Sequence, residues 1–377
     1  MTASQLISGE RFFATYHIAG DHAQATATAH DICLEQTVEF PDELIPDGMI
    51  RDHIVGRIES LTEVSAERFC VRISYAIETV GNELTQFLNV IFGNISIKQG
   101  IRLVDIELPK SLCTMVKGPR FGCDGLRRLL NVKDRPLLCT ALKPMGSTAE
   151  ELAVRAGQFA LGGIDIIKED HGLANQPFAP FEKRIELCAA AVAAANKKTG
   201  RNCIYVPSIS APSNDIVRRV AFAKNAGAAG ILIAPGLVGF DTMRMIAEDD
   251  TIALPVIAHP SFFGTYAIGC EVGISHSILY GLLPRLAGAD ATIYPNYGGR
   301  FSFSPQECTD IVKASATPLH HIRPIFPTPA GGMTLARVPD LKSFYGNEVI
   351  FLIGGGLVTH GPDVVKNCEE FLRMVEG

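Results

Sequence analysis

The chain has 377 residues, enough for two domains, and its 47% hydrophobic and 20% charged residues exclude global disorder. Its 34 lysine and arginine residues against 40 aspartate and glutamate residues give a net charge of −6, which argues against a nucleic-acid partner. No apolar run approaches the roughly 20 residues of a membrane span, and the first residues lack the pattern of a secretion signal, so we expect a cytoplasmic protein without a membrane partner.

The first part of the chain predicts an α+β domain. Apolar segments at residues 12–19, 68–77 and 86–97 predict antiparallel strands. A segment rich in proline and glycine, residues 117–136, closes this part. We therefore place the domain boundary near Lys133, which divides the chain into residues 1–133 and 134–377.

The second part alternates short apolar runs with amphipathic stretches. The eight runs begin at Leu137, Gly163, Cys203, Gly230, Leu254, Ala291, Ile322 and Val349. Apolar strands that alternate with helices indicate parallel strands covered by helices. A doubly wound sheet is the alternative, but eight units in sequence favour a (β/α)8 TIM barrel, so the predicted fold class is α/β.

The ten cysteines are scattered along the chain without a CxxC pair, and several lie in apolar runs. This pattern is typical of reduced and mostly buried thiols in a cytoplasmic protein.

Polar or glycine residues gather where the apolar runs end. They are Lys143, Lys168, Asp170, Ser208, His259, Asn296, Gly331 and Gly354. In a TIM barrel these ends form the face on which loops build active sites. The chain is therefore predicted to be an enzyme.

The segment GGIDIIKEDHGLANQPF, residues 162–178, carries the strongest local signal. Alternation along a strand places Lys168 and Asp170 on one face, with His171 just beyond. Aspartate and histidine suit a divalent cation, whereas a lysine could act as a base or stabilise charge. A solvated charged turn is the other interpretation, but the uninterrupted apolar strand before it favours a functional one.

Glycine clusters follow the last two predicted strands, at Gly331–Gly332 and at Gly354–Gly356. The loops at these positions of a TIM barrel often bind phosphate, because bare backbone N–H groups can approach the oxygens. Lys143 ends the first strand and His259 the fifth, and each could serve as an acid or a base. Taken alone, Lys143 is more typical of a surface lysine that extends its ammonium into solvent, and a single histidine such as His259 is more often structural.

The segments LLCTALKP, GGIDIIKEDHGLANQPF, PAGG and IGGG, in this order, resemble the large subunit of ribulose-bisphosphate carboxylase/oxygenase (RuBisCO). ATYHI, LEQTVE, FGN and GPRFGCDG extend the resemblance through the first part of the chain. The resemblance implies an N-terminal α+β domain and a TIM barrel. It also implies a homodimer or larger homo-oligomer whose active sites lie between one subunit's barrel and its partner's N-terminal domain.

Individual residues carry the resemblance further. Lys168 matches the lysine that reacts with CO2 to give a carbamate, which becomes a Mg2+ ligand beside Asp170. Lys143 and His259 match catalytic residues of the first and fifth strands. Gly332, Gly354 and Gly355 match the glycines of one phosphate site. Glu35 and Asn94 match residues that contribute to the partner subunit's active site.

Departures from the carboxylase pattern point to a RuBisCO-like protein of the non-carboxylating branch. His171 replaces the third carboxylate ligand, which puts the identity of the metal in question. Met145, Pro260 and Ala330 replace a lysine, an arginine and a serine, and some of these lost groups grip the second phosphate of a bisphosphate. One phosphate site remains, which implies a substrate with a single phosphate.

We therefore expect a metal-dependent enzyme that forms an enolate of a monophosphorylated keto-sugar or oxo-sugar acid, as an isomerase or as a decarboxylase or hydrolase. The methionine-salvage enolase of this branch uses a lysine where this chain has Asn94, which argues against that reaction. Genuine carboxylation of ribulose bisphosphate and a non-catalytic regulatory role are the alternatives.

Overall fold

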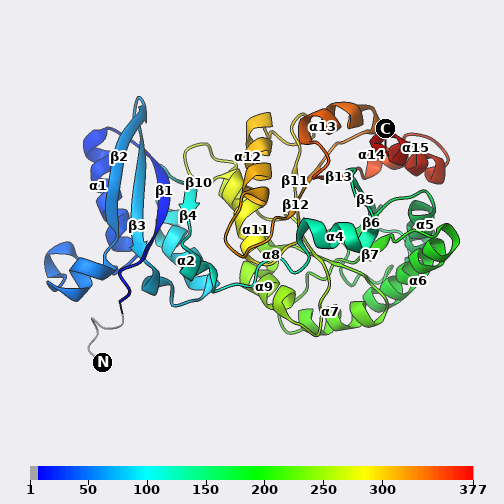
Figure 1. The fold of residues 1–377 in the computed structure, drawn as a ribbon, viewed down its shortest axis with the longest axis horizontal. Coiled ribbons are helices and arrows are strands. Elements are labelled where there is room, and N and C mark those ends of the chain that lie inside the picture. Colours follow the sequence, from blue (N-terminus) through cyan, green and yellow to red (C-terminus); the bar gives the residue numbers. More distant parts are fainter. Residues whose placement is uncertain (1–6, 377) are drawn as a thin grey trace. The chain divides into compact units, whose positions relative to one another are not determined.

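Two structural units make up the computed structural model of the chain, which describes residues 7–376 (Figure 1). The first unit holds the described residues up to Lys117 together with Phe263–Leu279. The second holds Gly118–Phe262 and the residues from Tyr280 onward. None of the helices within residues 7–376 is long and apolar enough to cross a membrane.

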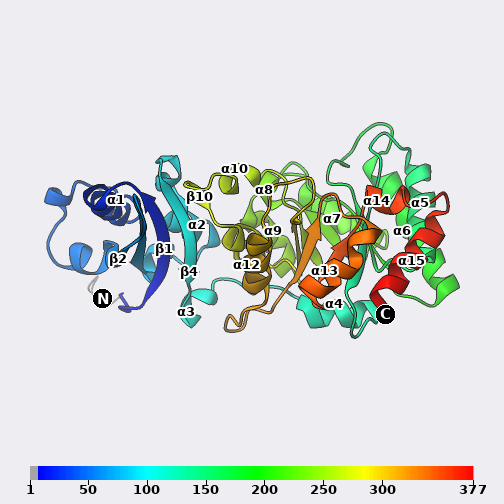
Figure 2. The same cartoon turned by 90° about the horizontal axis from the view of Figure 1, so that it is seen from above.

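The first unit is a five-stranded sheet with helices on it. Its strands are β1 (Arg11–Ala19), β2 (Arg57–Ser65), β3 (Arg68–Ala76), β4 (Ile101–Glu107) and β10 (Gly273–Ile274), in the order β10-β4-β1-β3-β2. Its α-helices are α1 (His22–Glu35), α2 (Leu84–Phe92), α3 (Lys110–Cys113) and α10 (Gly264–Ala267). Helix α1 packs on the sheet (Figure 2). Short 3-10 and π turns complete the unit, at Asp42–Leu44, Ile50–Ile54, Ile77–Val80 and Asn94–Ile97.

Two of the three strands predicted for this unit are confirmed, as β1 and β3. In β1 every second side chain is buried, from Phe12 to Ile18, which is the pattern of a strand with one covered face. The predicted strand at residues 86–97 is wrong, because this segment holds most of helix α2 and the turn after it. The buried residues of α2 include Leu84, Phe87 and Ile91, and this spacing of three and four residues is that of a helix face.

The second unit contains the eight parallel strands predicted from the apolar runs. They are β5 (Leu137–Leu142), β6 (Ile166–Glu169), β7 (Ile204–Val206), β8 (Ile231–Ile233), β9 (Val256–Ala258), β11 (Ala291–Pro295), β12 (Phe326–Ala330) and β13 (Ile350–Leu352). They pair as β13-β5-β6-β7 and as β12-β11-β9-β8. A bridge between Ser208 and Leu232 joins β7 to β8, and β12 lies beside β13. The strands therefore close into the predicted barrel.

Helices surround the barrel strands (Figure 1). They are α5 (Ala149–Leu161), α6 (Phe181–Thr199), α7 (Ile216–Asn225), α8 (Pro235–Val238), α9 (Phe240–Glu248), α11 (Leu283–Leu286), α12 (Pro305–Ala316), α13 (Val338–Tyr345), α14 (Gly355–Val358) and α15 (Val364–Glu376). Two short turns precede α11 and α13, at Ser277–Leu282 and Leu335–Arg337. Helix α6 ends at Thr199 and is capped by Gly200, whose φ of +73° favours glycine at this position.

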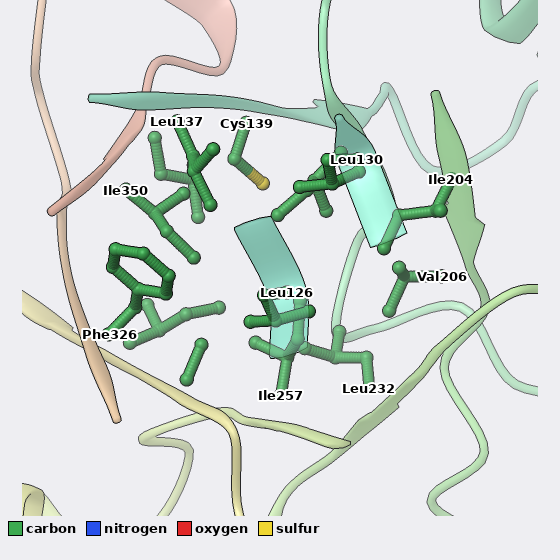
Figure 3. Packing of buried hydrophobic residues seen from close by; sticks show 14 of the residues in the cluster. Leu126, Leu130, Leu137, Cys139, Ile204, Val206, Leu232, Ile257, Phe326 and Ile350 are labelled. Atoms are coloured by element: carbon green, nitrogen blue, oxygen red, sulfur yellow. The ribbon is translucent and has the colours of Figure 1, made fainter. Parts of the chain in front are cut away.

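One further helix, α4 (Gly122–Leu130), closes the amino end of the barrel. Its Leu126 and Leu130 belong to one buried cluster with Leu137, Ile257 and Phe326, which come from three barrel strands (Figure 3). The two units divide between Lys117 and Gly118, whereas the sequence prediction placed the boundary near Lys133. The difference has a physical reason, because α4 buries its apolar side chains in the barrel core.

All ten cysteines are free, and eight of them are buried, as the sequence predicted.

Candidate active site

The carboxyl ends of three barrel strands bring together five of the residues predicted for the site. Lys143 directly follows β5, Lys168 lies in β6 with Asp170 and His171 after it, and His259 directly follows β9. Parallel strands of a closed barrel end on one rim, so their terminal side chains meet there. The charges of the other four act on the pKa of His259, as expected for neighbouring groups.

Asp170 is the charged centre of this cluster. Its Oδ1 lies 2.6 Å from Lys143 Nζ and 3.4 Å from His171 Nδ1. Burial acts to raise the pKa of Asp170, but the hydrogen bonds from His171 and Lys143 and the nearby lysine charges outweigh it and lower the pKa. Asp170 is therefore a carboxylate at neutral pH.

Lys168 points into the barrel and is only 3% exposed. Its Nζ donates a hydrogen bond to the backbone carbonyl of Glu169, at 3.0 Å. Burial lowers the pKa of Lys168, because the ammonium loses its hydration. The neutral amine, which is the nucleophilic form, is thus more populated than in an exposed lysine.

The imidazoles of His171 and His259 stack, with ring centroids 4.4 Å apart and planes 11° from parallel. Desolvation, together with the positive charges of Lys168 and His171, lowers the pKa of His259 well below its usual value. The Nδ1 atom of His259 accepts a hydrogen bond from the Ser261 backbone N–H, at 3.2 Å. The same Nδ1 lies 2.9 Å from the Ser261 hydroxyl. His259 is neutral near pH 7, because its pKa is lowered.

The residues present can hold a divalent cation if Lys168 carries a carbamate. Within residues 7–376, no group of three or more histidine, cysteine, aspartate or glutamate side chains is arranged to hold a metal. Asp170 and His171 supply one oxygen donor and one nitrogen donor, while Lys168 as an amine adds no anionic ligand. A carbamate on Lys168 would add the missing oxygen ligand, and the lowered pKa of this lysine favours the amine form that reacts with CO2.

The two glycine turns predicted to bind phosphate lie against each other. A β-carbon on Gly356 would lie 2.6 Å from the carbonyl oxygen of Met333, which follows the first turn. Gly331 and Gly332 have φ angles of +89° and +87°, which require glycine. Gly354 precedes α14, and a β-carbon there would lie 3.9 Å from Lys143 Cε, so this turn borders the lysine cluster.

Gly355 differs from its neighbours, because a β-carbon added to it would meet no other atom within 4 Å. The space beside it is open. The first N–H groups of a helix have no acceptor within the helix, so the start of α14 offers donors at this place.

Glu35 and Asn94, predicted to serve a partner's site, lie together in the first unit. Asn94 Nδ2 donates a hydrogen bond to Glu35 Oε1 at 2.9 Å. Both line a hollow whose other lining residues are mostly polar, namely Gln36, Thr37, Val38, Glu39, Gln86 and Asn89.

Another polar strand end, Asn296, is fully buried after β11. Its Oδ1 accepts a hydrogen bond from the Tyr345 hydroxyl at 2.6 Å, whereas its Nδ2 has no hydrogen-bond partner. Sequence reasoning missed Glu169, which pairs with Arg184 behind the strand, and Ser261, whose backbone N–H and hydroxyl both lie within hydrogen-bond distance of His259 Nδ1. Strand alternation could have identified Glu169, because a residue between Lys168 and Asp170 must face the opposite side.

Comparisons with known proteins identify relatives along nearly the whole chain. Residues 122–300 match the family model described as the catalytic domain of the ribulose bisphosphate carboxylase large chain. A 5-methylthioribulose-1-phosphate isomerase from Rhodospirillum rubrum is 38% identical, over 98% of this chain and 97% of that protein. A 2,3-diketo-5-methylthiopentyl-1-phosphate enolase from Bacillus licheniformis is 31% identical, over 96% of this chain and 91% of that protein. The crystal structure of a Rubisco-like protein from Rhodopseudomonas palustris superposes with a TM-score of 0.88 at 39% identity, and covers 97% of each chain.

Proposed function

The chain belongs to the family of the RuBisCO large chain and its RuBisCO-like relatives, and from this premise we propose that it is an enzyme that forms an enolate of a sugar phosphate without fixing CO2. The observation that carries the proposal is the cluster of Lys143, Lys168 and Asp170 on one rim of the barrel. The names of the relatives support it, since an isomerase and an enolase of phosphorylated methylthio-sugars are among them.

The substrate carries a carbonyl group and one phosphate. The glycine turns at Gly331–Gly332 and Gly354–Gly355 bind the phosphate through backbone N–H groups. Met145, Pro260 and Ala330 stand where the carboxylase pattern has basic or hydroxyl groups, so a second phosphate finds fewer partners. This argues against ribulose bisphosphate as the substrate.

Lys143 moves the proton at the carbon next to the carbonyl. Its ammonium is held on Asp170 at 2.6 Å, and 44% of its side chain is exposed, so a substrate can reach it. Neutral His259 forms a hydrogen bond with a substrate oxygen. Isomerisation and decarboxylation both pass through such an enolate, and the structure of the substrate determines which of the two reactions takes place.

Lys168 reacts with CO2 to form a carbamate: the amine nitrogen bonds to the carbon, and a proton leaves. The carbamate, Asp170 and His171 would hold a divalent cation, Mg2+ in the family pattern. When bound, such a cation would polarise the carbonyl and stabilise the developing enolate charge.

A homodimer completes the site, with Glu35 and Asn94 of one subunit serving the barrel of the other. Their hydrogen bond supports this role, because it holds the two side chains together at the wall of a polar hollow that a polar ligand could enter.

The test is a screen of monophosphorylated keto-sugars and sugar acids in D2O, with deuterium uptake next to the carbonyl followed by NMR. We expect uptake with at least one compound. Lys143→Ala should slow it by about 10²–10⁴-fold, the usual range for a lost general acid or base. Lys168→Ala should also slow it, because it removes the carbamate that would complete the metal ligands. Lys183→Ala, which removes an exposed lysine of α6, is the control and should leave the rate unchanged.

Measurable fixation of CO2 onto ribulose bisphosphate would contradict the proposal. A protein that binds sugar phosphates but exchanges no proton with any of them would contradict it in favour of a regulatory role.

A further inference from the structure

Behind the candidate active site lies a fully buried ion pair between Glu169 of β6 and Arg184 of α6. Both side chains are 0% exposed. Arg184 Nε and Nη2 donate to the two carboxylate oxygens of Glu169, at 2.5 and 3.2 Å. A bidentate pair of this kind fixes geometry as well as charge.

Arg184 also holds the loop that carries the site. This loop runs from Asp170 to Pro180, between β6 and α6, and begins with Asp170 and His171. Arg184 Nη2 donates to the carbonyl of Ala174 at 2.8 Å, and Nη1 donates to the carbonyl of Ala179. The guanidinium therefore ties the middle and the end of the loop to the strand from which it leaves.

Glu169 connects the same pair to the neighbouring strand. Its Oε1 accepts a hydrogen bond from the Tyr205 hydroxyl of β7 at 2.6 Å, and its Oε2 accepts one from the Ser208 backbone N–H at 2.9 Å. The backbone carbonyl of Glu169 accepts the hydrogen bond of Lys168 Nζ. The Glu169–Arg184 pair thus joins β6, β7, α6 and the loop.

We propose that Glu169 and Arg184 are positioning residues that hold Lys168, Asp170 and His171 in place for the proposed reaction. The inference rests on the proposed function for its catalytic meaning. Its structural basis is the alternation of β6, which makes Glu169 the anchor on the outer face between Lys168 and Asp170 on the inner face. A shift of Glu169 would move both Lys168 and Asp170, and it would also move the loop that carries His171.

A purely stabilising role is the alternative, and the chain offers a matched control for it. Asp165, directly before β6, accepts two hydrogen bonds from Arg135, at 2.7 and 2.9 Å. This second carboxylate is also largely buried and belongs to the same strand segment, but it lies at the amino end, away from the site. Glu169→Gln and Asp165→Asn are therefore equivalent amide substitutions at opposite ends of one strand.

The experiment compares the full-length protein with these two variants by NMR of labelled histidine side chains. His171→Gln and His259→Gln identify the two imidazole signals among those of the ten histidines. We expect Glu169→Gln to shift or broaden both signals and Asp165→Asn to leave them in place. Backbone hydrogen exchange of residues 171–180, measured by mass spectrometry, should rise about tenfold or more in Glu169→Gln alone.

Glu169→Gln leaves a buried guanidinium without its partner charge, so it can fail to fold. Tyr205→Phe then serves as the milder variant, because it removes one hydrogen bond to Glu169 and keeps the ion pair. We expect it to shift the same two signals by less.

The proposal is overturned if the variants at both ends of β6 lower stability and leave the two histidine signals and the exchange of residues 171–180 unchanged. These readouts need no substrate, so they test the positioning role independently of the proposed reaction. Once a substrate is known, Glu169→Gln should lower kcat about tenfold or more and change KM less than about twofold, since misplaced groups slow the chemical step.

Discussion

The two ends of the barrel each contain a buried aspartate, and the two carboxyl groups have opposite properties. Asp290 lies at the amino end, directly before β11, and Asp170 lies at the carboxyl end, directly after β6. Burial acts to raise both pKa values. The partners of each group decide the outcome.

Asp290 is held by backbone groups. It accepts hydrogen bonds from the N–H groups of Phe121, Gly122 and Val256, at 2.7, 2.7 and 2.9 Å. These bonds and the charge of Arg120 act against burial without overcoming it, and the pKa of Asp290 is raised to about 6. At this end the carboxyl group joins α4 to two strands and is closed off from solvent.

Asp170 is held by side chains that are partly exposed to solvent. Lys143 and His171 are 44% and 49% exposed, and their contacts to Asp170 lower its pKa. The comparison teaches that the buried carboxyl group at the amino end links structural elements. The charged groups at the carboxyl end remain accessible to a substrate. Three predictions test this difference.

The largest effect on stability is expected from helix α4, which closes the amino end of the barrel. Leu126→Ala removes a side chain that is 0% exposed within the core cluster, and should lower the free energy of unfolding by about 2–5 kcal/mol. The folded variant should keep its deuterium-uptake rate, because the cavity lies at the end away from the site. Urea titration measures the first quantity, and the NMR assay measures the second.

Val154→Ala is the matched control, since this valine of α5 is 64% exposed. Equal losses of stability in the two variants would contradict the assignment of α4 as a core element.

A smaller effect is expected from pH. The pKa of Asp290 lies above that of the unfolded chain, so the native state binds the proton more tightly, and stability falls as the pH rises from about 4 to about 6. A shift from 3.8 to about 6 corresponds to a loss of about 3 kcal/mol. Asp170 has the opposite sign: its contribution is present above pH 4 and is lost as the pH falls below that value.

Urea unfolding of the wild type, Asp290→Asn and Asp170→Asn between pH 4 and 7 separates the two groups. The fall between pH 4 and 6 should be smaller in Asp290→Asn than in the wild type and should persist in Asp170→Asn. The reverse result would show that the two carboxyl groups were assigned the wrong states.

The smallest effect on stability is expected at the glycine turns of the carboxyl end. Gly355→Ala enters open space and should change the free energy of unfolding by less than about 0.5 kcal/mol. Gly332→Ala places a β-carbon 3.1 Å from Arg300 at a φ of +87°, and should cost about 1 kcal/mol or more. If these turns bind phosphate, titration calorimetry with inorganic phosphate should show weaker binding in both variants, and unchanged affinity in Gly355→Ala would remove Gly355 from the site.

Local patterns in the sequence determined much of this protein. The eight apolar runs predicted all eight barrel strands, and the end of each run marked the rim where Lys143, Asp170 and His259 meet. Strand alternation placed Lys168 and Asp170 on one face. These features depend on spacing along a few residues, which a strand or a helix converts directly into a face.

Only the tertiary structure decided the rest, because it depends on contacts between distant segments. The segment at residues 84–92 is apolar enough for either a strand or a helix, and its packing made it α2. The sequence did not indicate that α4 would close the barrel, nor that Arg184 would bind Glu169 and the loop carbonyls. Barrel closure sets these distances, and the energy of burying Glu169 or Asp290 depends on which partners closure brings within reach.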